Sequence, residues 1–233
     1  MTDRSRPHRR VQGAFSRNRL VAIAIMCAAC GWIAFFFDLP VARLMQNDVL
    51  PGDIRKLFNF PEVAGHGLGV GLLIIGVAAL DPTLWRRSAG QVWFPSASFL
   101  RFFFATYSGA LVVNILKLLV IRVRPRSIDL ASLSSPLDTF GQLAACFSGA
   151  SGSDLMSFPS GHSAVAAGFA AALCHRYPHA RWYFITVAVG AMFQRIVSSA
   201  HYPSDVCWGA AIGLLGAAAC LSQPIDKSVL QTS

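Results

Sequence analysis

Residues Leu20–Phe37 read LVAIAIMCAACGWIAFFF, a run without a single charged side chain. An α-helix needs about 20 predominantly apolar residues to cross the hydrocarbon core of a bilayer, so this run predicts a membrane-spanning helix. The composition agrees with that interpretation. Hydrophobic residues make up 54% of the chain and charged residues only 13%, whereas soluble domains carry about 25% charged residues. The chain is therefore predicted to be an integral membrane protein.

Five further apolar runs follow along the 233-residue chain. The expected spans are residues 20–37, 65–80, 99–121, 161–174, 182–197 and 205–221. They predict an all-α fold, a six-helix membrane bundle over residues 20–222. Residues 1–19 form a basic tail before it and residues 223–233 a second tail after it. Between the first two spans, residues 39–61 predict a short amphipathic helix at the outer surface. Close helix contacts are expected at the glycines Gly65, Gly67, Gly69 and Gly71.

The distribution of Lys and Arg predicts the orientation of the bundle. Cytoplasmic segments of membrane proteins carry an excess of these residues. With the amino terminus inside, twelve of the 20 Lys and Arg residues fall on the cytoplasmic side and eight on the opposite side. Both termini are therefore expected in the cytoplasm. The formal charge of +9 is explained by a basic tail that touches anionic lipid, and no nucleic acid partner is expected.

Three polar clusters fall where four of the expected spans meet the outer surface. They are Lys117–Arg126 (KLLVIRVRPR), Phe158–Ser163 (FPSGHS) and Arg195–Asp205 (RIVSSAHYPSD). Ionisable side chains at membrane depth are costly, and they mark functional sites by default. The clusters therefore predict a site at this surface.

The first two clusters offer groups that bind an anion. Lys117 and Arg124 lie seven residues apart, close to two helical turns, and share a face if the helix persists. Pro125 disfavours helical geometry at Arg124, so the helix is expected to end there. Gly161 begins the next expected span, where unpaired backbone N–H groups and the helix dipole attract an anion. His162 adds a group that titrates near neutral pH.

The third cluster offers a possible nucleophile. His201 and Asp205 are four residues apart, so a helical turn or a tight loop can place the carboxylate on the imidazole. A carboxylate in that position orients a histidine and selects its tautomer. Arg195 adds a third cation at the same surface. Two histidines, three cations and one carboxylate together favour the cleavage of a phosphate ester.

The spacings Lys-x6-Arg-Pro, Pro-Ser-Gly-His and Arg-x5-His-x3-Asp resemble the signature of the type-2 phosphatidic acid phosphatase superfamily, which they match between Lys117 and Asp205. That superfamily includes lipid phosphate phosphatases, undecaprenyl pyrophosphate phosphatases, glucose-6-phosphatase and vanadium haloperoxidases. The resemblance therefore implies an acid-phosphatase/haloperoxidase-like core within the bundle. One departure is Gln194, which stands where the family usually has Ser.

The resemblance also implies a role for each motif residue. His201 would attack phosphorus and form a phosphohistidine, while Asp205 holds and polarises it. His162 would protonate the leaving oxygen and then activate water. The phosphoryl oxygens would be held, without a metal or other cofactor, by Lys117, Arg124, Ser160, Gly161 and Arg195.

These implications lead to a functional expectation. The chain is expected to be a metal-independent membrane phosphatase that hydrolyses a lipid phosphate or pyrophosphate at the outer face of a bacterial inner membrane. Its partners would be that lipid and the surrounding membrane lipids. Four substrates remain open: undecaprenyl pyrophosphate, phosphatidylglycerol phosphate, phosphatidic acid and a lipid A phosphate. A phosphotransferase with the same nucleophile is the alternative. An anion transporter is less favoured, because transporters place their site near the bilayer midplane between repeats.

Overall fold

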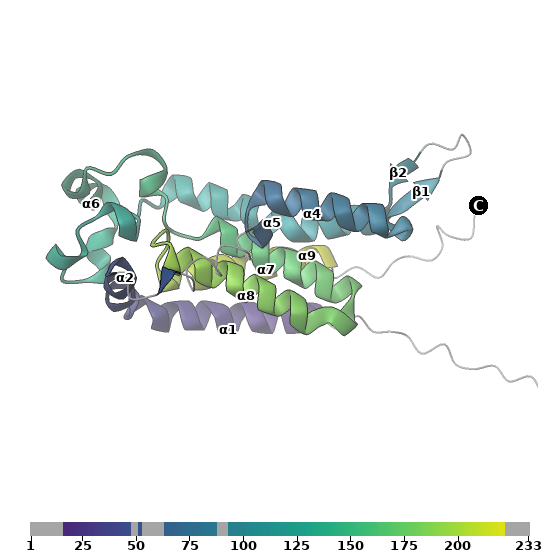
Figure 1. Ribbon diagram of the computed structural model, residues 1–233, viewed down its shortest axis with the longest axis horizontal. Helices are drawn as coiled ribbons and strands as arrows, with labels where there is room; N and C mark the ends of the chain where they lie inside the picture. The colour runs from purple at the N-terminus through teal and green to yellow at the C-terminus, as the bar shows by residue number, and fades with distance from the viewer. Residues whose placement is uncertain (1–15, 48–50, 53–62, 88–92, 222–233) are drawn as a thin grey trace, which may run out of the picture.

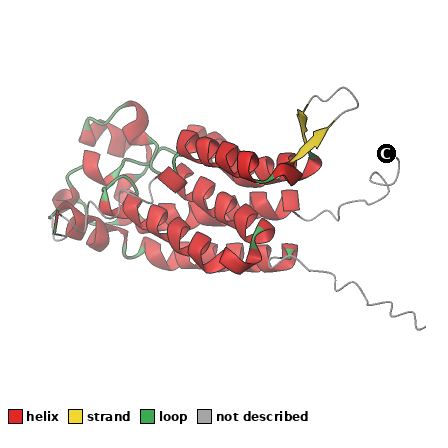
Figure 2. Cartoon of the chain, turned by 45° about the vertical axis from the view of Figure 1, so that its right-hand side comes forward, coloured by secondary structure: helices red, strands yellow, loops and turns green. Residues whose placement is uncertain are grey.

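A computed structural model of the chain describes residues 16–47, 51–52, 63–87 and 93–221 (Figure 1). In these residues, helices are joined by loops, and strands are limited to a short antiparallel hairpin of β1 (Trp85–Arg87) and β2 (Trp93–Pro95) (Figure 2). The predicted all-α class is therefore confirmed. Most of the two predicted tails, residues 1–15 and 223–233, lies outside the described part of the chain.

Helices occupy all six places where spans were expected. They are α1 (Arg17–Phe35), α4 (Gly67–Leu80), α5 (Ala97–Leu119), α7 (Gly161–Arg176), α8 (Arg181–Val197) and α9 (Pro203–Leu221). Among the described helices, α1, α5 and α9 are long and apolar enough to cross a membrane by themselves. Helix α4 is apolar but has 14 residues, and α7 and α8 have 16 and 17. The predicted count of six is therefore not reproduced as six full-length apolar spans.

Shorter elements lie at the two ends of these helices. Helices α2 (Asp38–Gln46) and α6 (Gly141–Ser148) lie beyond one end, and the hairpin lies at the other, where α1 begins and α9 ends (Figure 1). The remaining described elements are single 3₁₀ turns: Pro82–Leu84, Pro125–Ser127, Leu130–Ser132, Pro136–Thr139, Gly152–Leu155 and Pro178–Ala180. Helix α2 supplies a short helix in the first part of the predicted range 39–61, although it begins one residue earlier, at Asp38. Residues 48–50 and 53–61 of that range lie outside the described part of the chain.

Helix α7 is the centre of the bundle. Every residue from Ser163 to Cys174 is buried, and the helix packs against α4, α5, α8 and α9. Its many alanines explain this position, because small side chains let four neighbours approach one helix. The outer helices instead turn large apolar side chains such as Leu68, Leu72 and Leu111 outward. Outward-facing apolar side chains are typical of helices surrounded by lipid.

Glycines bring three of the helices into backbone contact. A Cβ atom added to Gly213 of α9 would clash with the carbonyl oxygen of Ala164, and one added to Gly109 of α5 would lie 2.5 Å from Gly213 Cα. The four glycines predicted for this role behave differently. A Cβ atom added to Gly65 would lie 3.2 Å from the carbonyl oxygen of His162 on α7, whereas one added to Gly67 would meet nothing within 4 Å. The prediction is wrong at Gly67, because spacing alone does not show which helix face meets a neighbour.

Candidate active site

His201 lies in a tight turn between α8 and α9. The carbonyl oxygen of Arg195 accepts hydrogen bonds from the backbone N–H groups of Ala200 and His201, both at 3.1 Å. The imidazole is only 1% exposed, and its Nδ1 lies 2.7 Å from the carbonyl oxygen of Ser157. A carbonyl oxygen can only accept, so Nδ1 carries the hydrogen. This tautomer leaves the lone pair on Nε2 available for attack on an electrophile.

The surroundings of His201 also keep it neutral. Burial lowers the pKa of His201 to about 4, although Asp205 acts in the opposite direction. At neutral pH the imidazole is therefore unprotonated. Only this form has the free electron pair that a nucleophile needs.

Asp205 supports His201 less directly than predicted. Its Oδ2 lies 3.8 Å from His201 Nδ1, which is too far for a hydrogen bond. Instead Oδ2 accepts from the hydroxyl of Ser157 at 2.6 Å and from the backbone N–H of Tyr202 at 3.0 Å. The reason is that α9 begins at Pro203, so Asp205 lies in its first turn and caps it. The Ser157 carbonyl takes the position beside Nδ1 that the carboxylate was expected to take.

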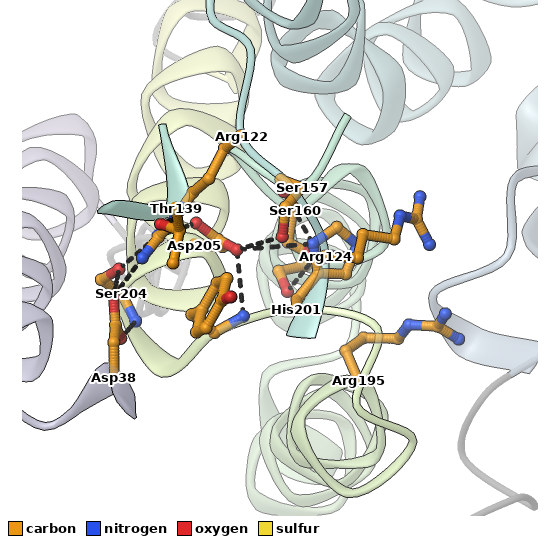
Figure 3. A network of polar contacts seen from close by, with 12 residues as sticks. Asp38, Arg122, Arg124, Thr139, Ser157, Ser160, Arg195, His201, Ser204 and Asp205 are labelled. Carbon is orange, nitrogen blue, oxygen red and sulfur yellow. Dashed lines mark hydrogen bonds and ion pairs between the residues drawn. The ribbon is translucent and has the colours of Figure 1, made fainter. Parts of the chain in front are cut away.

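Arg122 is a central residue of the site that the motif spacings did not identify. It is fully buried, and its guanidinium contacts Asp205, the Ser204 hydroxyl at 2.9 Å and Asp38 Oδ2 at 2.6 Å (Figure 3). Its Nε donates to the hydroxyl of Thr139 at 3.1 Å. Two features of the sequence could have indicated this ion pair: Asp38 directly follows the first expected span, and Arg122 is an additional arginine inside the first polar cluster.

The chain around Arg122 is extended rather than helical. Helix α5 ends at Leu119, five residues before the predicted end at Arg124. The backbone N–H of Arg122 then donates to the carbonyl oxygen of Leu155 at 3.0 Å, and that of Arg124 donates to the carbonyl oxygen of Asp154 at 2.8 Å. The far end of the loop that follows, at Asp154 and Leu155, is thus hydrogen-bonded to the extended segment that carries both arginines. The β-branched residues Val120 and Ile121 favour this extended backbone.

Three cations gather beside His201. Lys117, Arg124 and Arg195 lie close enough to repel one another, and the side chains of Arg124 and Arg195 extend on the side of His201 away from Asp38 (Figure 3). Burial and the charges of Arg126 and Arg195 lower the pKa of Arg124. Gln194, the departure from the family pattern, accepts a hydrogen bond from Arg195 at 3.0 Å. Such a cluster of like charges favours an anion between its members.

The amino end of α7 completes the site. Ser160 is buried and caps the helix, because its hydroxyl accepts from the backbone N–H of Ser163 at 3.4 Å as well as from the hydroxyl of Ser163 at 2.9 Å. The amino group of Lys117 lies against the backbone here, 3.8 Å from where a Cβ of Gly161 would be. The ring of His162 is 5.6 Å from that of His66, centroid to centroid. All predicted site residues therefore come together at the end of the bundle where α2 lies. Direct contact of Ser160 with phosphate stays a prediction.

The described residues contain no group of three or more His, Cys, Asp or Glu side chains arranged to hold a metal ion. The groups available to an anion are instead the cations and the backbone N–H groups at the start of α7.

Acidification is expected to reduce the free energy of unfolding through His201. In the folded protein its pKa is about 4, below its ordinary value of about 6.5. As the pH falls, the unfolded chain binds the proton first. Stability is therefore lost progressively between about pH 6.5 and pH 4, by up to about 3 kcal/mol. Thermal unfolding in detergent, followed from neutral pH down to about pH 4, measures this loss. His201→Gln should show a weaker pH dependence than the wild type, and equal slopes would contradict the assignment.

Comparisons with known proteins cover the part of the chain that forms this site. Residues 98–228 match the family model of the PAP2 superfamily. A lipid A 1-phosphatase of Rhizobium johnstonii is 35% identical over 54% of this chain and 48% of its own length, about half. A lipid A 1-phosphatase of Rhizobium etli is 33% identical over 76% of this chain and 72% of its own. The crystal structure of a transmembrane PAP2-type phosphatidylglycerolphosphate phosphatase from Bacillus subtilis shares the fold. It has a TM-score of 0.58 and 19% identity, and the match covers 94% of this chain and 99% of that one.

Proposed function

This chain belongs to the PAP2 superfamily, and we propose that it is a membrane phosphatase that hydrolyses a lipid phosphate through a phosphohistidine on His201. The observation that carries the proposal is the state of His201. Its Nδ1 is held by the Ser157 carbonyl, its burial favours the neutral form, and three cations lie beside it. A neutral nucleophile next to an oxyanion site is what phosphoryl transfer requires.

The first half of the reaction transfers the phosphoryl group to the protein. Nε2 of His201 attacks phosphorus, and the bond from phosphorus to the lipid oxygen breaks. His162 donates a proton to that departing oxygen. The phosphorylated ring keeps its Nδ1 hydrogen on the Ser157 carbonyl and carries a positive charge, which the carboxylate of Asp205 stabilises from 3.8 Å.

The second half releases phosphate. His162, now without its proton, accepts one from a water molecule, whose oxygen attacks the same phosphorus. The bond from phosphorus to Nε2 breaks, and His201 returns to its neutral state. In both halves Lys117, Arg124 and Arg195 balance the charge on the phosphoryl oxygens. These cations give the electrostatic stabilisation that metal ions give in other phosphoryl-transfer sites.

The relatives favour one substrate among the four that the sequence left open. Two proteins that are 33% and 35% identical to this chain are named as lipid A 1-phosphatases. We therefore propose the phosphate at position 1 of lipid A as the first substrate to test. The positively charged tail before α1 suits the cytoplasm. The site, at the opposite end of the bundle, would then face the outer side of an inner membrane.

A substrate panel in detergent tests this function. The purified protein is expected to release phosphate from lipid A in millimolar EDTA about as fast as without it, because the cations need no metal. Phosphatidic acid, phosphatidylglycerol phosphate and undecaprenyl pyrophosphate form the comparison set. Inorganic phosphate release is the measurement. Strong inhibition by EDTA would contradict the mechanism, and a faster rate on another member of the set would replace lipid A as the substrate.

A further inference from the structure

His66 is a further histidine beside the candidate general acid, and the mechanism above gives it no role. Its ring lies 5.6 Å from the ring of His162, centroid to centroid, with an angle of 66° between the ring planes. The side chain is exposed, and it belongs to the residue directly before α4. The family model covers residues 98–228, so His66 lies outside the matched region and outside all three motifs. Only the fold places it at the site.

The turn that carries His66 is held against the start of α7. A Cβ atom added to Gly65 would lie 3.2 Å from the carbonyl oxygen of His162 and 3.4 Å from its Cβ. The backbone carbonyl of His66 accepts from the N–H of Val70 at 2.8 Å, whereas its side chain makes no capping hydrogen bond to α4. The turn therefore keeps the imidazole beside His162, and the helix end does not use it.

The strongest electrostatic neighbours of His162 do not stabilise its protonated form. Four side chains act most strongly on its charge: Arg195, His201, His66 and Lys117. None of these four is a carboxylate. His162 is also the second residue of α7, where the helix dipole disfavours a cation. The protonated ring therefore depends on hydrogen bonds to stay in place.

An imidazolium ring has two N–H donors, one on each nitrogen. In the proposed mechanism one of them points at the leaving oxygen of the substrate, so the other requires a different acceptor. Lys117 and Arg195 have no acceptor atoms. His201 is occupied, because its Nδ1 is held by the Ser157 carbonyl and its Nε2 attacks phosphorus. Among these four neighbours, His66 is the one that can accept.

Resting on the proposed function, we propose that His66 is a positioning residue for the general acid. Its ring accepts a hydrogen bond from the second nitrogen of His162, directly or through one water molecule. In the first half of the reaction this contact keeps the other N–H aimed at the leaving oxygen. In the second half it favours the tautomer of His162 whose lone pair accepts a proton from water. Its loss should weaken acid catalysis without removing the nucleophile.

Two aryl phosphates of similar shape test this role. Nitrophenolate is a good leaving group, whereas phenolate is a poor one that depends more on a proton from the acid. The values of kcat/KM are measured in detergent for para-nitrophenyl phosphate and for phenyl phosphate. His66→Phe should raise the ratio of the first value to the second by about five- to tenfold, part of the hundredfold or so that a general acid contributes. His66→Gln keeps an acceptor oxygen and should raise the ratio less.

Tyr107→Phe is the matched control, since the hydroxyl of Tyr107 donates to the carbonyl oxygen of Gly67 at 2.8 Å. It removes a contact that holds the start of α4 but changes neither histidine, and it should keep the wild-type ratio. An unchanged ratio in His66→Phe would overturn the proposal even if both rates fall, because a purely structural change lowers both values alike. An equal rise of the ratio in Tyr107→Phe would also overturn it.

A spectroscopic measurement separates this inference from the proposed function. The chain has six histidines, and in protein with nitrogen-15 in the histidine rings the signals of His162 are those lost in His162→Gln. Spectra are recorded in detergent with inorganic phosphate as the probe. His66→Phe should change the tautomer pattern of His162 and leave that of His201 as it is. Unchanged His162 signals would overturn the inference even if the wild type is an active phosphatase. A changed pattern would support it even if the wild type releases no phosphate.

Discussion

Replacement of His201 by Gln should reduce phosphate release from lipid substrates by about 10⁴-fold or more, because removal of a covalent nucleophile costs about that much or more in comparable enzymes. Gln retains a hydrogen-bond donor for the Ser157 carbonyl, which accepts from His201 at 2.7 Å. It does not have the nucleophilic ring nitrogen. The loss therefore reports the chemistry of the imidazole more than the packing of the turn.

A matched control is available at the other end of the molecule. His179 lies in the 3₁₀ turn Pro178–Ala180 between α7 and α8, away from the site motifs. His179→Gln makes the same chemical change outside the site and should keep the wild-type rate. A His201→Gln protein that retains more than about one hundredth of the activity would remove His201 from the role of nucleophile.

His162→Gln separates the two halves of the reaction. An aryl phosphate such as para-nitrophenyl phosphate has a good leaving group, which departs with little help from an acid. The variant should therefore still form the phosphohistidine from this substrate, but it should hydrolyse it slowly. A burst of one nitrophenol per protein, followed by acid-labile phosphate on His201, is the expected signature. The absence of both in a folded variant would contradict the assigned role of His162.

The sequence predicted the membrane bundle and the motif residues, for physical reasons that can be stated. Long apolar runs have few alternatives to membrane helices. Costly charges near the ends of such runs mark a site, and the three clusters that contain Lys117, His162 and His201 have this pattern. What spacing did not show was the backbone path between motifs. Helix α5 ends at Leu119, and the residues that follow hydrogen-bond to distant loop segments. The β-branched residues after Leu119 favour an extended backbone, but the sequence does not show which distant segment pairs with it.

The hydrogen-bond and ion-pair partners of His201 and Asp205 were also not predictable from the motif spacings. The Ser157 carbonyl, which holds Nδ1, is a backbone group, and a backbone group has no signature in a motif. Asp38 and Arg122 are 84 residues apart in the chain, and each directly follows the end of an expected span in the sequence. Only the fold shows that they form one buried network with Asp205. The consequence is that part of the catalytic geometry depends on residues outside the third motif.

That network leads to the second large prediction: Arg122→Met should lower the free energy of unfolding by about 3 to 5 kcal/mol, the cost of removing one partner of a buried ion pair. The guanidinium and both of its carboxylate partners have no exposed side-chain surface. Met preserves much of the volume, so the loss reflects the carboxylates of Asp38 and Asp205 left without their cation. Thermal or denaturant unfolding in detergent measures the change.

Arg126 supplies the control, since its side chain is 46% exposed and pairs with Asp154 at 2.8 Å. Arg126→Met should cost about 1 kcal/mol or less, the usual range for an exposed ion pair. The double variant Arg122→Met/Asp38→Asn should recover part of the stability lost in Arg122→Met, because it removes one of the two unpaired charges. Recovered stability without recovered phosphatase activity would mean that Arg122 positions Asp205, and through it the turn that carries His201. If Arg122→Met is no less stable than Arg126→Met, the buried network does not hold the site together.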